Sequence, residues 1–268
     1  MTGIEQGTAL TMDKQAIKGG HMTAKDRLIV ALDVSTMAEA RALMDELSSE
    51  VGMFKAGLEL FSACGTEIFA AAEETGAKLF LDSKFHDIPN TVAGACRAVV
   101  AHGPALFNLH ALGGRKMMDA AKAARDEAFE TLEQEGGGKS SLHKPTLIAV
   151  TILTSMNAAE LEGDLKVTMP LTEMVLHLAA MARDCGLDGV VASAHEASAI
   201  RDLCGQDFLI VTPGIRPSWS EANDQSRIVT PGDAIARGAD MIVVGRPITN
   251  ARDKKDAARR IVAELEGA

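Results

Sequence analysis

Short apolar runs alternate with amphipathic segments along the chain from about residue 25 onward. The runs are continuously apolar rather than alternating in polarity, which indicates strands buried on both faces, as in a parallel sheet. Eight runs fit this description: 27–33, 51–57, 79–84, 105–110, 147–153, 188–193, 208–212 and 240–245. Each is followed by a segment with helical spacing of apolar residues: 36–49, 66–75, 91–101, 116–134, 171–185, 195–204, 232–237 and 256–265. The repeat therefore predicts eight consecutive strand–helix units.

Eight such units in this length predict an α/β protein with a closed (β/α)8 barrel, a TIM barrel, as a single domain over residues 25–268. The main alternative is a doubly wound open sheet. It has less support, because no Gly-x-Gly-x-x-Gly motif follows the first run. Residues 1–24 are polar, glycine-bearing and aperiodic, so we predict a disordered N-terminal tail or a leader left by expression.

The composition narrows the range of partners and compartments. A chain of 268 residues with 47% hydrophobic residues can bury a substantial core. Its formal net charge of -10 argues against nucleic-acid binding by phosphate neutralisation, although it allows a local basic pocket for a small anion. The four cysteines form no Cys-x-x-Cys pair, which predicts neither a zinc site nor a disulfide framework and favours the cytoplasm. Apolar runs stay well short of the ~20 residues that span a bilayer, so we expect no membrane segment.

Charged residues gather where the predicted strands end. In a parallel barrel these ends share one rim, which is where such folds place their active sites. The first three strands bring to this rim Asp33, Lys55, Asp82, Lys84 and, just beyond, Asp87. Burying an unpaired charge costs roughly several kcal/mol, so the alternating signs predict a mutually neutralising network. A purely structural barrel has no need of three acids and two lysines at one rim.

The segment Asp82-Ser83-Lys84 is the centre of this network. Side chains at positions i and i+2 of a strand point the same way, so Asp82 and Lys84 should sit side by side. Taken alone, the pair is equally well explained as a structural ion pair at a strand end. Pro89 should end the strand, and Asn90 should cap the helix that follows.

The last two strands indicate a phosphate site. Barrels often bind phosphate after strands seven and eight, through backbone N–H groups and a nearby helix start. Gly245 permits close backbone approach, and Arg246 offers a charge-assisted pair of hydrogen bonds. Arg216 and Gln225, on the long loop after strand seven, could close over the phosphate. The alternative for Gly245-Arg246 is a turn that merely starts a helix.

Several segments together carry a family resemblance. Asp82-x-Lys84-x-x-Asp87-Ile88-Pro89-Asn90-Thr91 resembles the signature of the orotidine 5'-phosphate decarboxylase family in its bacterial form. Further matches occur in the family's expected order: Ala31-Leu32-Asp33, Phe54-Lys55, Leu153-Thr154-Ser155, Thr212-Pro213-Gly214-Ile215-Arg216-Pro217, Asp224-Gln225 and Val244-Gly245-Arg246-Pro247. The resemblance extends from about Asp26 to the C-terminus and covers all eight units.

The resemblance implies an enzyme that converts orotidine 5'-phosphate to uridine 5'-phosphate and CO2, the last step of de novo pyrimidine synthesis. It implies a homodimer and no metal or organic cofactor. Lys84 takes the position of the proton donor, with Asp82 beside the substrate carboxylate and Lys55 and Asp87 completing the charged set. Asp87 and Thr91 would reach into the partner subunit's site. The resemblance further implies that Asp33 and Lys55 hold the ribose hydroxyls and that Thr154 contacts the pyrimidine ring. The phosphate would be bound by Arg216, Gln225, Gly245 and Arg246.

The residue chemistry suits this reaction independently. Loss of CO2 leaves a carbanion-like centre that no carbonyl is positioned to delocalise, and a fixed ammonium group stabilises that charge and then protonates it. Two alternatives stay open. One is a metal-dependent sugar-phosphate decarboxylase or aldolase on a related barrel with a similar Asp-x-Lys-x-x-Asp motif. The other is a non-catalytic barrel that binds a phosphate ligand. The Ile88-Pro89-Asn90-Thr91 extension and the Gly-Ile-Arg-Pro loop favour the nucleotide enzyme.

Three residues near the predicted rim have less specific interpretations. For His110, at the end of the fourth strand, a packing or hydrogen-bonding role is favoured over direct catalysis. His86 is expected at a solvated or interface position. Trp219, the only tryptophan, is equally well explained by closure over a ligand and by surface packing.

Overall fold

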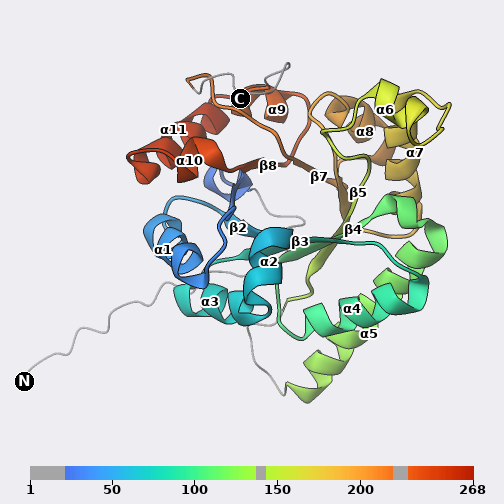
Figure 1. Cartoon of the computed structure of the whole chain (residues 1–268), viewed down its shortest axis with the longest axis horizontal. Helices are drawn as coiled ribbons and strands as arrows, with labels where there is room; N and C mark the ends of the chain where they lie inside the picture. The colour runs from blue at the N-terminus through green and yellow to red at the C-terminus, as the bar shows by residue number, and fades with distance from the viewer. Residues whose placement is uncertain (1–21, 137–142, 220–228) are drawn as a thin grey trace, which may run out of the picture.

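The structure, a computed structural model, describes residues 22–136, 143–219 and 229–268. In this part of the chain, parallel strands close into a barrel in sequence order, with β8 pairing back to β1 (Figure 1). The strands are β1 (Leu28–Ala31), β2 (Met53–Ala56), β3 (Leu79–Phe85), β4 (Leu106–His110), β5 (Thr146–Val150), β6 (Gly189–Val191), β7 (Leu209–Thr212) and β8 (Met241–Val244). The predicted α/β fold with a (β/α)8 barrel is confirmed.

Helices form the layer outside the barrel (Figure 1). The helical segments expected from the sequence correspond to α1 (Met37–Leu47), α3 (Glu67–Thr75), α4 (Pro89–Val100), α5 (Arg115–Glu135), α7 (Leu171–Asp184), α8 (Ala197–Cys204), α9 (Pro231–Ala236) and α11 (Lys254–Glu266). Short helices that the pattern did not predict lie in connections after strands: α2 (Leu58–Cys64), α6 (Ala158–Gly163) and α10 (Arg246–Thr249). The 3-10 turns η1 (Lys25–Arg27) and η2 (Ala111–Gly113) precede β1 and follow β4.

Helix α4 begins earlier than the sequence predicted. Its first residue is Pro89, and Asn90 lies inside the helix rather than at its cap. Proline suits the first helical position because its φ is already helical and its missing N–H would have no partner there. The prediction that Asn90 caps the helix is therefore wrong, whereas β3 does end before Pro89 as expected.

Alternation along the strands builds a polar layer on an apolar floor. The floor is the interior cluster of Ile29, Ala31, Met53, Phe80, Leu106, Ile148, Val150, Val191, Leu209, Val211, Met241 and Val243. The residues between them on the strands pack outward against the helices. Because side chains on a strand repeat every two residues, the residue two positions after an interior one also faces inward. Lys55, Asp82 and Asn108 follow interior residues of β2, β3 and β4 at this spacing.

The described chain begins within the segment predicted to be a tail. Met22 packs against the interior cluster, and Ala24 packs against the outer core. Contacts to the barrel therefore start before Lys25. Residues 1–21, the rest of the predicted tail, lie outside the described residues.

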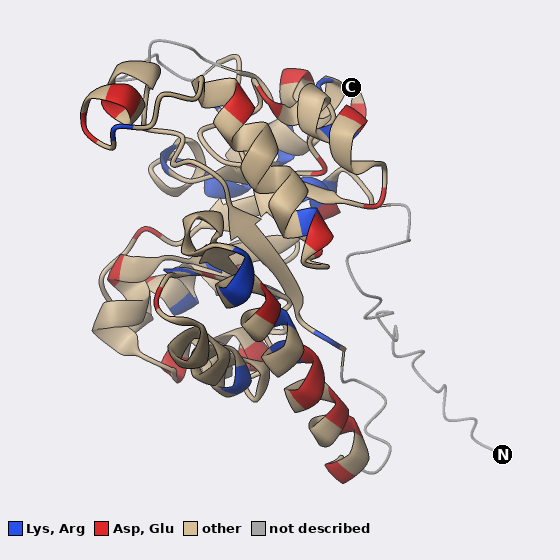
Figure 2. Cartoon of the chain, turned by 90° about the vertical axis from the view of Figure 1, so that its right-hand side faces the viewer, with Lys and Arg blue, Asp and Glu red and all other residues tan. Residues whose placement is uncertain are grey.

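Charged residues are spread over the outer helices (Figure 2). Acidic positions follow one another along the end of α5, which extends past its neighbours, in keeping with the net charge of -10. Among the helices of the described ranges, none combines the length and the apolar character that crossing a membrane requires.

Candidate active site

A pocket of about 320 Å³ lies at the carboxyl ends of the barrel strands, above the apolar floor. Of the eleven site residues predicted from the sequence, eight line this pocket: Asp33, Lys55, Asp82, Lys84, Thr154, Arg216, Gly245 and Arg246. Asp87 and Thr91 do not line it, and Gln225 lies outside the described residues. The fold thus brings together residues that are more than 200 positions apart in the chain.

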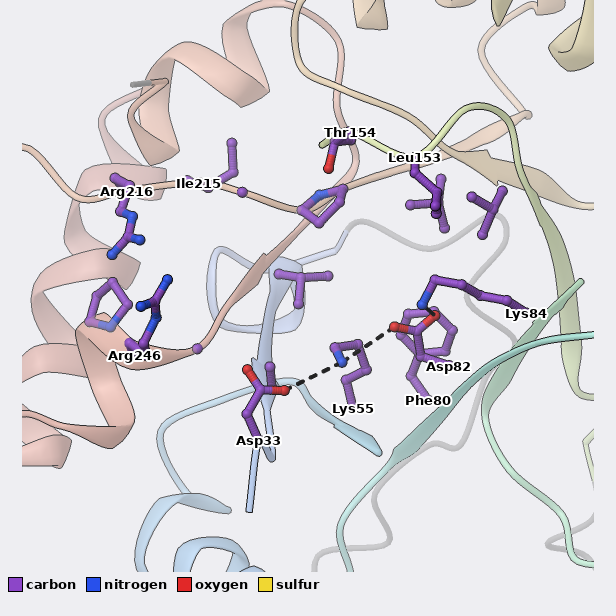
Figure 3. A pocket seen from close by; sticks show the side chains of 18 of the residues that line it. Asp33, Lys55, Phe80, Asp82, Lys84, Leu153, Thr154, Ile215, Arg216 and Arg246 are labelled. Carbon is purple, nitrogen blue, oxygen red and sulfur yellow. Dashed lines mark hydrogen bonds and ion pairs between the residues drawn. The ribbon is translucent and has the colours of Figure 1, made fainter. Parts of the chain in front are cut away.

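Four charged side chains form a ladder of alternating sign along one side of the pocket (Figure 3). Lys55 Nζ lies 3.8 Å from Asp33 Oδ1 and 3.3 Å from Asp82 Oδ2. Lys84 Nζ lies 2.7 Å from Asp82 Oδ1. The two positive and two negative formal charges cancel, so this charge ladder of Asp33, Lys55, Asp82 and Lys84 is neutral before a ligand enters.

Asp82 is the most strongly engaged member of the charge ladder. Its side chain is only 13% exposed, and this burial alone would raise the pKa of the carboxyl. The ammonium groups of Lys55 and Lys84, together with hydrogen bonds from Lys84 and Asn108, outweigh burial, so the pKa of Asp82 lies below its ordinary value. Asp82 is therefore a fixed negative charge at neutral pH.

Strand β3 departs from regular geometry where it carries the two central charges. Its register with β4 shifts between Leu81 and Phe85, so that the three residues between them face Asn108 alone. Inside this bulge Lys84 has a positive φ of 51°. The predicted contact between Asp82 and Lys84 is present, but a bulge, rather than the regular alternation assumed from the sequence, directs Lys84 to it.

Asn108 is a site residue that sequence reasoning missed. It is 0% exposed. Its Oδ1 accepts a hydrogen bond of 2.7 Å from the backbone N–H of Lys84, and its Nδ2 donates one of 2.7 Å to Asp82 Oδ1. The sequence did contain an indication, because Asn108 is an amide side chain flanked by apolar residues of the strand. It stands two residues before His110 and therefore faces the same, interior side.

Two arginines lie at the opposite end of the pocket from Lys84 (Figure 3). Arg216 belongs to the connection after β7, and Arg246 is the first residue of α10. Arg216 is only 8% exposed, yet among the residues that the structure describes no carboxylate pairs with either guanidinium group. Because a buried cation is costly without a counter-charge, this end of the pocket favours an anionic group of the ligand.

Two glycines leave room for Asp33 and Lys55, at one end of the charge ladder. A Cβ at position 57 would lie 3.1 Å from Lys55 Nζ. A Cβ at position 245 would lie 3.0 Å from Asp33 Oδ2, so Gly245 makes space for the Asp33 carboxylate as well as for a ligand. A side chain at either position would crowd the groups that line the pocket.

Asp87 and Thr91 are exposed on the rim outside the pocket. Asp87 Oδ1 accepts a hydrogen bond of 2.6 Å from the N–H of Ile88, whose own side chain is 67% exposed. In a single chain, Asp87 therefore does not join the charge ladder that the sequence led us to expect.

His110 faces the barrel interior but does not line the pocket. Its Nδ1 accepts a hydrogen bond of 3.4 Å from the N–H of Leu112, and its ring stacks on His86 with centroids 5.4 Å apart. Burial, followed by the charges of His86 and Lys84, lowers the pKa of His110 to about 4, so it is neutral at pH 7. These contacts agree with the packing and hydrogen-bonding role favoured from the sequence.

Trp219 packs on helix α11. The guanidinium group of Arg260 lies 4.1 Å from the centroid of its ring, and the neighbouring Ser218 Oγ donates a hydrogen bond of 3.2 Å to Glu264 Oε1. Trp219 is not among the residues that line the pocket, and it packs against the outer core.

These features define a class of protein. A TIM barrel whose mouth holds a neutral charge ladder at one end and two arginines at the other is suited to an enzyme for a phosphorylated small molecule. The end with the two arginines is separated from the end where Lys84 and Asp82 meet (Figure 3). Chemistry is therefore expected on a part of the substrate remote from its phosphate.

Comparison with known proteins identifies the family. The orotidine 5'-phosphate decarboxylase / HUMPS family matches residues 26–261 of the chain, and the chain belongs to this family. The orotidine 5'-phosphate decarboxylase of Syntrophomonas wolfei is 47% identical over 246 residues, which cover 91% of this chain and 100% of that protein. The enzyme of that name from Rhodospirillum rubrum is 50% identical over 242 residues, covering 90% and 94%.

A solved structure supports the same assignment. The crystal structure of orotidine 5'-phosphate decarboxylase from Lactobacillus acidophilus matches with a TM-score of 0.75 at 37% identity, covering 89% of this chain and 98% of that chain. The family resemblance seen in the sequence motifs is confirmed.

Proposed function

We propose that the protein decarboxylates orotidine 5'-phosphate to uridine 5'-phosphate and CO2, the last step of de novo uridine 5'-phosphate synthesis. The position of the Lys84 ammonium group carries the proposal. It lies against Asp82 in a pocket whose far end has two arginines without a counter-charge in the described chain. The names of the curated relatives support the same reaction.

The order of residues along the pocket matches the parts of this nucleotide. Arg216, Gly245 and Arg246 would bind the phosphate, together with Gln225, which lies outside the described residues. Asp33 and Lys55, between the two ends, would hold the ribose hydroxyls. Thr154, from the connection after β5, would contact the pyrimidine ring. This placement leaves the pyrimidine carboxylate at the pair formed by Asp82 and Lys84.

Lys84 would act on the reacting carbon in two ways. When the bond between C6 and the carboxylate breaks, its electron pair stays on C6 and CO2 leaves. The ammonium group of Lys84 stabilises the developing negative charge and then donates a proton to C6, which gives the product. The resulting neutral amine regains a proton from solvent before the next turnover.

Asp82 would contribute by crowding the substrate carboxylate. Two carboxylates repel one another, whereas neutral CO2 escapes this repulsion, so the interaction favours the products of bond cleavage. The hydrogen bonds and ammonium groups around Asp82 hold its charge in place. Binding energy from the remote phosphate can offset the repulsion in the bound substrate.

We propose that this chemistry uses no metal or organic cofactor. Both oxygens of Asp82 already face ammonium groups, and Lys55 also pairs with Asp33. A divalent cation would have to displace these lysines from the charge ladder.

The reaction can be tested with purified protein. Consumption of orotidine 5'-phosphate, followed by its ultraviolet absorbance, is expected without added metal and at an unchanged rate after treatment with a chelator. Turnover that disappears with the chelator and returns with Mg²⁺ would instead support the metal-dependent sugar-phosphate enzyme class. If no CO2 is released in any condition, the result would support the other alternative, a non-catalytic barrel that binds a phosphate ligand.

Arg246→Ala is expected to raise the KM for orotidine 5'-phosphate by about 10- to 100-fold, because a charge-assisted hydrogen bond contributes about 1.5–3 kcal/mol. The change in kcat should be smaller. Arg252→Ala, at an exposed position of the same connection that does not line the pocket, is the matched control. An unchanged affinity in Arg246→Ala, measured by steady-state kinetics and by uridine 5'-phosphate binding, would remove Arg246 from the phosphate site.

We further propose a homodimer in which Asp87 and Thr91 of each chain reach the site of the other. Both residues are exposed on the rim near the pocket but do not line it. Large apolar side chains are exposed in the connections after three neighbouring strands: Leu58 after β2, Ile88 after β3 and Leu112 after β4. Apolar groups exposed together on one rim favour a protein partner.

We also propose a cytoplasmic location. The four cysteines are free thiols, which is typical of proteins in a reducing compartment.

A further inference from the structure

One side chain of β4 closes the bulge in β3. The bulge sets three residues of β3 opposite Asn108, and the outer two of these are Asp82 and Lys84. Asn108 bonds to both: to the backbone N–H of Lys84 and to the carboxylate of Asp82, each at 2.7 Å. The two charged residues that define the reacting end of the pocket are thus tied to a single buried amide.

The amide group of Asn108 matches these two neighbours in only one orientation. The backbone N–H of Lys84 is a donor and needs the Oδ1 acceptor, whereas the ionised Asp82 carboxylate accepts and needs the Nδ2 donor. Leucine, which has a similar shape, would satisfy neither neighbour. Aspartate would satisfy Lys84 but would set a second carboxylate against Asp82.

The backbone of Lys84 needs such a restraint. Its φ of 51° lies in the left-handed region, which residues other than glycine rarely adopt. Conformations of this kind persist only where the surrounding structure fixes them. Asn108 holds the backbone of Lys84 directly, and it also holds Asp82 Oδ1, the atom to which the Lys84 ammonium group donates.

We infer that Asn108 is a positioning residue for the decarboxylation, which fixes the Lys84 backbone and the Asp82 carboxylate so that the Lys84 ammonium group faces the reacting carbon. The inference rests on the proposed function. Asn108 does not line the pocket, so it acts through its two neighbours rather than on the substrate. Arg216 and Arg246, which would anchor the nucleotide by its phosphate, lie at the opposite end of the pocket from Lys84 and Asp82, the two residues that Asn108 holds (Figure 3).

The test compares Asn108→Leu and Asn108→Asp with the wild type. Thr212→Val is the matched control, because Thr212 is also a fully buried polar residue on a barrel strand, and its hydroxyl has no partner in the described chain. Each protein is assayed for kcat with orotidine 5'-phosphate and for affinity and stoichiometry of uridine 5'-phosphate binding. In Asn108→Leu we expect kcat to fall about a hundredfold, while the affinity for uridine 5'-phosphate changes less than about threefold. Thr212→Val should match the wild type in both.

Asn108→Asp provides a readout that a merely structural role would not change. A proton shared between its carboxyl and that of Asp82 restores a donor toward Asp82, so its kcat relative to the wild type should rise as pH falls from about 8 to about 5.5. Lys55 on β2, Lys84 on β3 and His110 on β4 are the other titratable groups near this position, and they are present in both proteins. The ratio of the two pH profiles therefore isolates the new carboxyl group.

The outcomes are separable. A kcat of Asn108→Leu within about threefold of the wild type would overturn the inference. The inference would also be overturned if Asn108→Leu lost kcat and binding stoichiometry equally and the kcat of Asn108→Asp relative to the wild type did not change with pH. If Asn108→Leu does not fold, that ratio decides alone: a rise toward acid supports the inference and a flat ratio overturns it. If the wild type itself releases no CO2, the proposed function fails. The wild-type assay therefore distinguishes failure of the proposed function from failure of the inference about Asn108.

Discussion

Lys84→Ala is expected to lower kcat for orotidine 5'-phosphate by about 10⁴-fold or more, because one ammonium group supplies both the charge stabilisation and the proton. Binding of uridine 5'-phosphate should largely survive. The reason is geometric: Arg216 and Arg246 lie at the opposite end of the pocket, and the substitution leaves them intact (Figure 3). Loss of Lys84 also leaves Asp82 with Lys55 as its only ammonium partner in the described chain, so the site becomes more negative where the substrate carboxylate must lie.

The measurement combines CO2 release with calorimetric binding of uridine 5'-phosphate. Lys78→Ala is a suitable control, because Lys78 is exposed and directly precedes β3, at the end of the same strand away from the pocket. It should retain full activity. Turnover of Lys84→Ala close to that of the wild type would refute the role of Lys84, and loss of both binding and turnover would show that the substitution disturbed the whole pocket.

The barrel could be predicted because its pattern is local and repeated. Each strand is buried on both faces and therefore reads as a continuous apolar run, and each run is followed by an amphipathic helix. The short helices α2, α6 and α10 were missed because they are additional to the repeat of one helix after each strand, and four to seven residues show little of a helical period.

The rim residues could be predicted because the two-residue period of interior-facing side chains continues from the apolar part of each strand to its charged end. Lys55 and Asp82 follow interior apolar residues by two positions, and Asp33 follows Ala31 in the same way. The β3 bulge could not be predicted, because it depends on the register between two strands, and a single strand's sequence does not encode that register directly. Asn108 was missed for the same reason: its importance lies in what stands opposite it.

Asp87 shows a different limit of prediction from a single chain. The motif places it three residues after Lys84, yet in a single chain it lies outside the pocket. Its proposed role needs a second copy of the chain, so neither the sequence pattern nor the fold of one chain supplies its partner. A test in solution has to do so.

Mixing Lys84→Ala and Asp87→Ala proteins is expected to restore activity that neither has alone. If each site combines Lys84 of one chain with Asp87 of the other, a hybrid dimer contains one site with both residues intact and one with neither. Random exchange at equal amounts makes half of the dimers hybrid, so about a quarter of wild-type activity should return. Lys84 is 30% exposed toward the pocket mouth, so a carboxylate from a partner has access to it.

The recovery is measured as CO2 release after the mixed proteins have exchanged subunits, with exchange shown by co-purification of two differently tagged chains. Mixing Lys84→Ala with the double variant Lys84→Ala/Asp87→Ala is the control, because no combination of these chains contains an intact site. No recovery in the test mixture, despite proven exchange, would contradict the shared site. Near wild-type activity of Asp87→Ala by itself would remove Asp87 from the charged set, since a fixed carboxylate beside Lys84 is expected to orient and hold its ammonium group.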